Sequence, residues 1–271
     1  EATGIAGLAR RLRALPALAI VLLVALSTLR EGHRAASDLG TLFASPLPPA
    51  QQVVLVSIGP EDYRRHFASR SPLDAGVLER LVHRVLAGGP AVLGVDIDTS
   101  DPSFARLRDS FAGVRPGVLV WAEGVEGLPG TTERPRPQGV LGGSPAGDHA
   151  GAALALSLAD ADDGVVRRYS QAIETDRGLR PTLYAAMARA GRETDAWEPD
   201  TQARVIRYTP TSRLDVPASV VLSEGFDWQD RIENRVVLLG GRYDRADLHP
   251  TPQGRSQGID VVANAVETEM R

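Results

Sequence analysis

The segment VVLVSI, residues 53–58, is an apolar and mostly β-branched run that ends at Gly59-Pro60. An uninterrupted run of this length, bounded by a turn signal, is typical of a strand that is buried on both faces. A second run of the same kind is AVLGV, residues 91–95. We predict a strand at each place, and the residues between them determine how the two strands pair.

Those intervening residues have the pattern of an amphipathic helix. Ser71 is the predicted N-cap, Pro72 suits the first helical position, and Gly88-Gly89-Pro90 ends the helix. Apolar residues recur at helical spacing along one face: Leu73, Val77, Leu78, Leu81, Val82 and Val85. A strand, a helix and a strand joined by short connections predict a right-handed βαβ unit with parallel strands.

The same alternation continues toward the C-terminus. Glycine and proline are frequent at 123–149, where we expect an exposed loop. Further strands are predicted at 117–121, 165–169, 204–208 and 235–239, and further helices at 179–190, 217–224 and 259–270. The fold class predicted is therefore α/β, with a mixed, largely parallel sheet flanked by helices and a meander inserted in the middle.

The N-terminal part of the chain has a different character. Residues 14–29 read ALPALAIVLLVALSTL and carry no charge, while arginines flank the run on both sides. We predict a transmembrane helix at 14–30, a cytoplasmic segment at 1–13, a juxtamembrane linker at 31–50 and the folded domain at 51–271. A cleaved signal peptide and a buried core helix remain open alternatives. The anchor and the signal peptide both place the domain outside the cytoplasm.

Composition excludes several classes of function. The chain has no cysteine and no lysine, so cysteine nucleophiles, zinc–thiolate sites, disulfides and Schiff-base or P-loop lysines are absent. The net charge of −4 gives no basic excess for binding nucleic acid. No G-x-G-x-x-G motif occurs, and we predict no cofactor and no resident metal.

The ordered set of motifs resembles the CHASE2 family of extracytoplasmic sensor domains. The matching pieces are VVLVSIG (53–59), SPLDAGVLERLVHRVLAGGPAVLGVDID (71–98), DDGVVRR (162–168), IRYTP (206–210), RVVLLGG (235–241) and DLHPTPQGRSQGIDVVANAV (247–266). Two positions depart from the pattern: Gly59 stands where an aspartate is common, and Val262 where a histidine is common. If the aspartate and the histidine that other members carry at these two positions contact a ligand, those contacts are missing here.

The resemblance implies the ligand-sensing module of a bacterial inner-membrane receptor. Such a module relays a conformational change to a cytoplasmic kinase or nucleotide cyclase, which this sequence does not contain. The chain itself is then not an enzyme. Its expected partners are the membrane, an unknown small-molecule or protein ligand, and a second copy or another membrane protein.

Asp96 and Asp98 close the second predicted strand. Side chains two residues apart in a strand point to the same face, and ligands of α/β sheets favour the carboxyl ends of strands. Two close carboxylates share a proton or hold a cation. The alternative is that both carboxylates only cap the backbone amides of the following turn.

Asp244, Asp247 and His249 follow the last predicted strand, also at its carboxyl end. We expect this loop and the Asp96–Asp98 end to border one cleft, since carboxyl ends of parallel strands share one edge. Their residue types would suit a divalent metal, although three such residues between turn-forming prolines are more often turn formers.

Arg167 follows the predicted turn Asp162-Asp163-Gly164 and is a candidate for binding an anion. A solvated strand end is the alternative for this arginine and for Arg168.

Two other functions stay open beside sensing. One is a docking or assembly module of a membrane complex, and the other is a metal-assisted extracytoplasmic hydrolase that uses the paired carboxylates.

Overall fold

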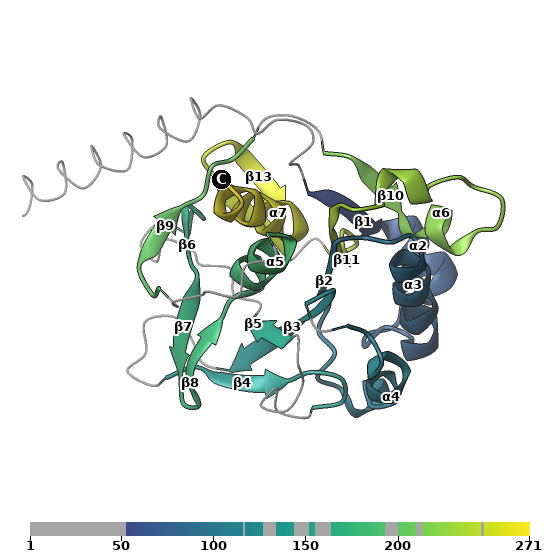
Figure 1. Cartoon of the computed structure of the whole chain (residues 1–271), viewed down its shortest axis with the longest axis horizontal. Coiled ribbons are helices and arrows are strands. Elements are labelled where there is room, and N and C mark those ends of the chain that lie inside the picture. The colour runs from purple at the N-terminus through teal and green to yellow at the C-terminus, as the bar shows by residue number, and fades with distance from the viewer. Residues whose placement is uncertain are drawn as a thin grey trace, which may run out of the picture. The chain divides into compact units, whose positions relative to one another are not determined.

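A computed structural model of the chain describes residues 53–115, 117–126, 134–143, 152–154, 164–192, 200–209, 213–244 and 247–271 (Figure 1). Its strands are β1 (Val54–Ile58), β2 (Val92–Asp96), β3 (Leu119–Glu126), β4 (Arg136–Gly139), β5 (Ala152–Leu154), β6 (Arg168–Ser170), β7 (Ala172–Thr175), β8 (Gly178–Pro181), β9 (Ala203–Val205), β10 (Asp215–Pro217), β11 (Val236–Gly241), β12 (Leu248–Thr251) and β13 (Gly254–Gln257). Its α-helices are α2 (Pro60–His66), α3 (Ala75–Ala87), α4 (Leu107–Phe111), α5 (Leu183–Gly191), α6 (Ala218–Leu222) and α7 (Gly258–Glu269).

The apolar runs form the centre of a seven-stranded sheet with the order β10-β1-β11-β2-β3-β4, to which β5 adds beside β3. All pairings in this sheet are parallel except that of β3 with β4. Strands β1 and β2 are parallel, as predicted, but β11 lies between them. The predicted mixed, largely parallel sheet flanked by helices is therefore confirmed.

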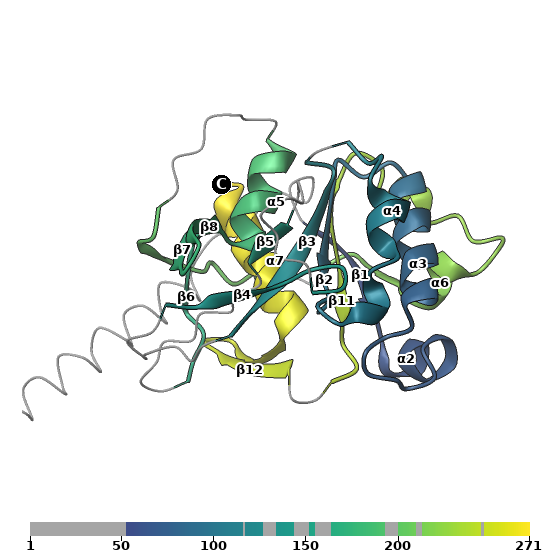
Figure 2. The same ribbon diagram turned by 90° about the horizontal axis from the view of Figure 1, so that it is seen from below.

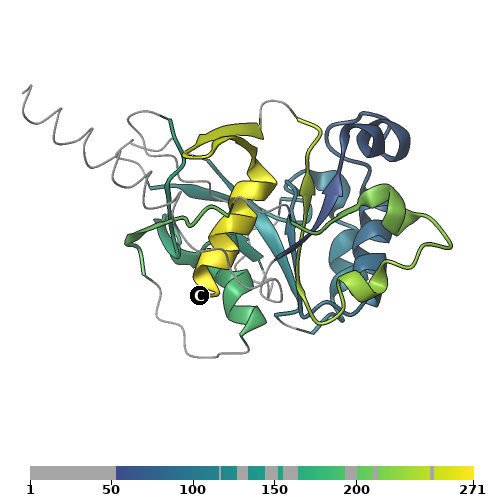
Figure 3. The ribbon, with the colours of Figure 1, turned by 90° about the horizontal axis from the view of Figure 1, so that it is seen from above.

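Helices cover both faces of this sheet (Figure 2). Residues of β1 alternate between the two faces, so that Val54, Val56 and Ile58 join one core and Val53 and Leu55 the other. Helices α3, α4 and α6 supply the first core, whereas α5 and α7 supply the second. The second core is tight: a Cβ added at Gly94 of β2 would lie 2.2 Å from the sulfur of Met187 on α5. Helices α5 and α7 also pack against each other (Figure 3).

Several predicted boundaries were wrong. Helix α3 begins at Ala75 instead of Pro72, because the carboxylate of Asp74 accepts the Val77 N–H at 2.9 Å and is the actual N-cap. The expected helix at 179–190 begins only at Leu183, since residues 178–181 pair with β7. Within the expected loop at 123–149, β3 continues to Glu126 and β4 pairs with it.

The predicted transmembrane helix at 14–30 and the linker at 31–50 lie outside the described residues. In the ranges given above, no helix is both long and apolar enough to cross a membrane.

Candidate functional site

Asp96 is the last residue of β2 and pairs in register with Gly240 of β11. Val92 belongs to the core under α5 and α7, and Gly94 faces Met187 of α5, so the alternation of the strand sends Asp96 to this same face. Gly240 lets α7 approach closely, since an added Cβ there would lie 3.0 Å from Ile259 Cδ1. The carboxyl end of β2 and the start of α7 therefore meet at one edge of the sheet.

Asp247 lies at the same edge, beside the start of α7. Its Oδ2 accepts the N–H of Gly258, the first residue of α7, at 3.1 Å, and its Oδ1 lies 3.0 Å from His249 Nε2. A Cβ at 258 would lie 2.4 Å from Asp247 Oδ1, so a larger residue there would displace this carboxylate. A carboxylate at this place also offsets the positive end of the helix dipole.

The charges of Asp96, Asp247 and His249 act on one another. Burial and, next, the nearby carboxylate of Asp247 raise the pKa of Asp96 to about 6, while His249 opposes the rise. The hydrogen bond with Asp247 and the carboxylate of Asp96 both raise the pKa of His249. The expectation that the loop after β11 lies near Asp96 is thus correct for Asp247 and His249.

Tyr184 of α5 completes the cluster, and sequence reasoning did not find it. Its side chain is 2% exposed, and the hydroxyl has no hydrogen-bond partner among the described residues. Burial and the neighbouring charge of Asp96 raise its pKa, so the hydroxyl stays protonated. We call Asp96, Tyr184, Asp247 and His249 the edge cluster.

Asp98 does not have the place expected for it. The strand ends at Asp96, and Asp98 is exposed, with its Oδ1 accepting the Ser100 N–H at 2.9 Å. The capping alternative is therefore the right one for Asp98. Asp244 is exposed on the segment after β11. In the described residues no three histidine or acidic side chains are grouped so that they could hold a metal ion.

Arg167 is not a solvated strand end, because its side chain is only 4% exposed. The segment around Arg167 is not a strand that runs from a hairpin turn into solvent. It is hydrogen-bonded to two other segments of the chain. Val166 N–H donates to Pro250 O, and Ile206 N–H donates to Arg167 O, both at 2.8 Å. The positive charge of Arg167 acts on the hydroxyl of Tyr208, whose pKa it lowers against the larger effect of burial.

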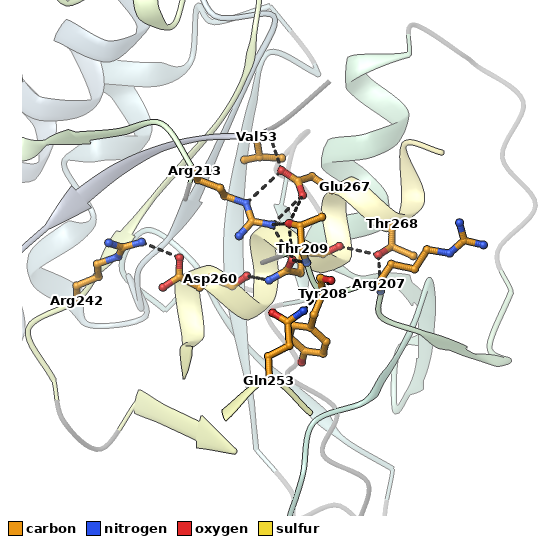
Figure 4. A network of polar contacts seen from close by, with 11 residues as sticks. Val53, Arg207, Tyr208, Thr209, Arg213, Arg242, Gln253, Asp260, Glu267 and Thr268 are labelled. Carbon is orange, nitrogen blue, oxygen red and sulfur yellow. Dashed lines mark hydrogen bonds and ion pairs between the residues drawn. The ribbon is translucent and has the colours of Figure 1, made fainter. Parts of the chain in front are cut away.

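A second polar group runs along α7 (Figure 4). Glu267, 1% exposed, accepts the Val53 N–H at 3.0 Å and binds the guanidinium of Arg213 through both of its oxygens. Asn264 Oδ1 accepts from Arg213 Nη2 at 2.7 Å and from Thr209 N at 3.0 Å. We call Val53, Thr209, Arg213, Asn264 and Glu267 the α7 network.

The last turn of α7 is held on its other side as well. Glu269 accepts hydrogen bonds from the Tyr169 hydroxyl and, at 2.6 Å, from Gln171 Nε2, and it pairs with Arg204 at 3.2 Å. These partners come from β6, β9 and the residue between β6 and β7. Buried carboxylates thus fix the end of α7 to β1 and to the smaller sheets.

A pocket of about 290 Å³ lies elsewhere, at the end of α3 and the loop after α6. Phe226 and Trp228 line it, together with Arg84, whose guanidinium already donates to the carbonyls of Val221 and Ser223. Ser223 and Gln229 of this pocket also have hydrogen-bond partners within the fold, so the edge cluster is the better candidate site.

Comparison with known proteins gives a family. A family model for the CHASE2 domain matches residues 15–271. The chain belongs to the CHASE2 family. CHASE2 domains are extracytoplasmic sensor domains of membrane signalling receptors. No curated protein and no solved structure matches the chain.

In this CHASE2 domain, Asp247→Asn is expected to lower the pKa of His249 toward its ordinary value. The asparagine keeps the shape of the side chain but removes its negative charge. That negative charge favours the protonated, positively charged form of His249. The titration of His249 can be followed by NMR, with the exposed His83 of α3 as an internal reference whose signals should be alike in both proteins. An unchanged midpoint for His249 would contradict its coupling to Asp247.

Proposed function

We propose that this CHASE2 domain is the extracytoplasmic ligand-sensing part of a membrane-anchored receptor, and that it relays a conformational change to a cytoplasmic kinase or nucleotide cyclase. Family membership supports the sensing role. The uncharged run at 14–29, with Arg10, Arg11 and Arg13 before it, supports an N-terminal anchor whose leading end stays in the cytoplasm.

The observation that carries the proposal is the way in which α7 connects the edge cluster to the beginning of β1. Asp247 binds the first N–H of α7, and Glu267 in its last turn binds the first described residue, Val53. A ligand that moves Asp247 or Asp96 would therefore act on a helix whose far end is tied to the residues that follow the proposed anchor. Such a ligand shifts the population between two arrangements of α7 if it binds one of them more tightly.

Membrane orientation is tested by fusing two reporters to Arg271 of the whole chain. One reporter fluoresces only in the cytoplasm, and the other is a phosphatase active only outside it. We expect an active phosphatase and a dark fluorescent protein, and the reverse for a control that lacks residues 14–29. Bright fluorescence from the intact chain would refute the proposal.

The mass of the mature protein separates an anchor from a signal peptide. A retained residue 1–13 segment supports the anchor, and cleavage after the apolar run would contradict it while leaving the domain exported. A hydrolase is not proposed, since the edge cluster offers neither a metal-ligand set among the described residues nor a nucleophile beside a base.

A further inference from the structure

The edge cluster has more negative than positive charge. The carboxylates of Asp96 and Asp247 face a single imidazole, which already contacts Asp247 at 3.0 Å. The positive end of α7 also lies near Asp247, whose Oδ2 accepts the Gly258 N–H. Among the described residues whose charge acts on Asp96 there is no arginine, and the cationic group is His249.

The cluster also has buried polar atoms without partners. The Tyr184 hydroxyl lies where the charge of Asp96 acts on it, yet it neither donates nor accepts a hydrogen bond among the described residues. Outside the edge cluster, Gln257, the residue before α7, also has a buried side-chain oxygen that accepts nothing from the described residues. Unpaired buried polar atoms are costly, and a fold retains them where another molecule can pair with them.

The cluster is open to solvent on one side. The side chain of Asp247 is 43% exposed and that of His249 is 30% exposed, whereas Tyr184 forms the buried floor. A small molecule can thus reach Asp247 and His249 from outside without opening the core.

We propose that the edge cluster binds a small organic cation with N–H donors, an amine or a guanidine, between Asp96 and Asp247; this inference rests on the sensing role proposed above. The N–H groups supply the donors that both carboxylates and the Tyr184 hydroxyl can accept. The positive charge relieves the repulsion between the two carboxylates. An anion would itself be repelled by the two carboxylates. A neutral ligand would leave the repulsion between them unchanged.

Binding should be linked to protons. The groups that face Asp96 are Asp247 and His249 of the segment around β12 and Tyr184 of α5. A cation lowers the pKa of Asp96 from its raised value of about 6, so the cation and the proton compete for the carboxylate. Affinity is therefore expected to fall as the pH decreases below about 6, and binding near that pH should release protons.

The proposal is tested by titrating the purified whole chain with agmatine, ethylammonium and methylguanidinium, followed by NMR and calorimetry. Tetramethylammonium, which is a cation without N–H donors, and Mg²⁺ serve as comparison probes. We expect at least one of the three donors to bind at neutral pH with signal changes at the edge cluster, and neither comparison probe to do so. Binding by none of the three, or equal binding by tetramethylammonium or Mg²⁺, would overturn the proposal.

Variants make the test specific. Asp96→Asn is expected to weaken binding by at least about tenfold, because one of the two charge-assisted partners is lost. Tyr184→Phe should weaken binding severalfold while leaving the fold as stable as before or more so, since the hydroxyl has no partner to lose. Asp98→Asn, two residues from Asp96 and exposed, is the matched control and should change nothing. Equal affinity of the Asp96 and Asp98 variants would place the ligand elsewhere.

This experiment is independent of membrane orientation. Amine binding together with a cytoplasmic reporter signal would refute the proposed receptor role and keep the ligand class. An extracytoplasmic domain that binds none of the three probes would refute the ligand class alone.

Discussion

Replacing Glu267 by alanine is expected to destabilise the domain by about 3–5 kcal/mol, the range for removing one partner of a buried ion pair. Glu267 is 1% exposed and the side chain of Arg213 6% exposed, so water cannot replace the lost carboxylate. The substitution leaves a buried guanidinium with Asn264 and Thr209 as its remaining partners among the described residues, and it removes the acceptor of the Val53 N–H. Denaturant unfolding of the purified chain in detergent micelles measures the loss.

The matched control is Glu61→Ala. Glu61 pairs with Arg64 and Arg65 on the surface of α2, where all three side chains are more than half exposed. Exposed pairs of this kind contribute less than about 1 kcal/mol. A loss at Glu267 no larger than the loss at Glu61 would show that the α7 network does not fasten the helix to β1.

A double replacement separates packing from charge. Arg213→Met combined with Glu267→Leu removes both charges and fills a similar volume, so it should recover part of the stability. If Glu267 also transmits a movement of α7 to β1, the double variant should fold stably. A movement of α7 should then no longer reach β1.

The sheet could be predicted from the sequence because its strands are buried on both faces. Such strands appear as unbroken apolar runs, and the short connections of the first βαβ unit require parallel strands. The pairing order could not be predicted: nothing in VVLVSI specifies that β11, about 180 residues later, inserts between β1 and β2. Local boundaries failed where two signals competed, as when Asp74 displaced Ser71 as the cap of α3.

The candidate site was predictable only in part for a related reason. The rule that ligands favour the carboxyl ends of strands indicated Asp96, Asp247 and His249. It gave Asp98 the same place, because the point at which β2 ends is not encoded in the alternation of its residues. Tyr184 and Glu267 were missed, since each lies on a helix whose buried face appears apolar, and their environments are formed by distant segments.

Asp96→Asn should, in contrast, stabilise the domain at neutral pH. The folded state holds this carboxyl with a pKa near 6 instead of its ordinary 3.8, so between these values the folded protein binds more protons than the unfolded chain. Stability from Asp96 is thus present in full below about pH 3.8 and is lost as the pH rises through about 6. At neutral pH the wild type bears the whole cost of the ionised, half-buried carboxylate.

Asparagine has no such charge, and the difference between the two proteins therefore depends on pH. The rise in the pKa of Asp96 from 3.8 to about 6 corresponds to about 2–3 kcal/mol. We expect Asp96→Asn to increase the free energy of unfolding by this amount at about pH 7.5. The gain should shrink to about 1 kcal/mol near pH 4.5, where Asp96 is protonated in the folded protein.

Denaturant unfolding of both proteins at the two pH values gives the comparison, and Asp98→Asn provides the control. A pH-independent difference would mean that Asp96 is not strained by its neighbours, and a loss of stability at neutral pH would mean that its carboxylate is already paired. An amine bound between Asp96 and Asp247 would recover the part of this gain that comes from the repulsion between the two carboxylates, which is smaller than the part that comes from the burial of Asp96.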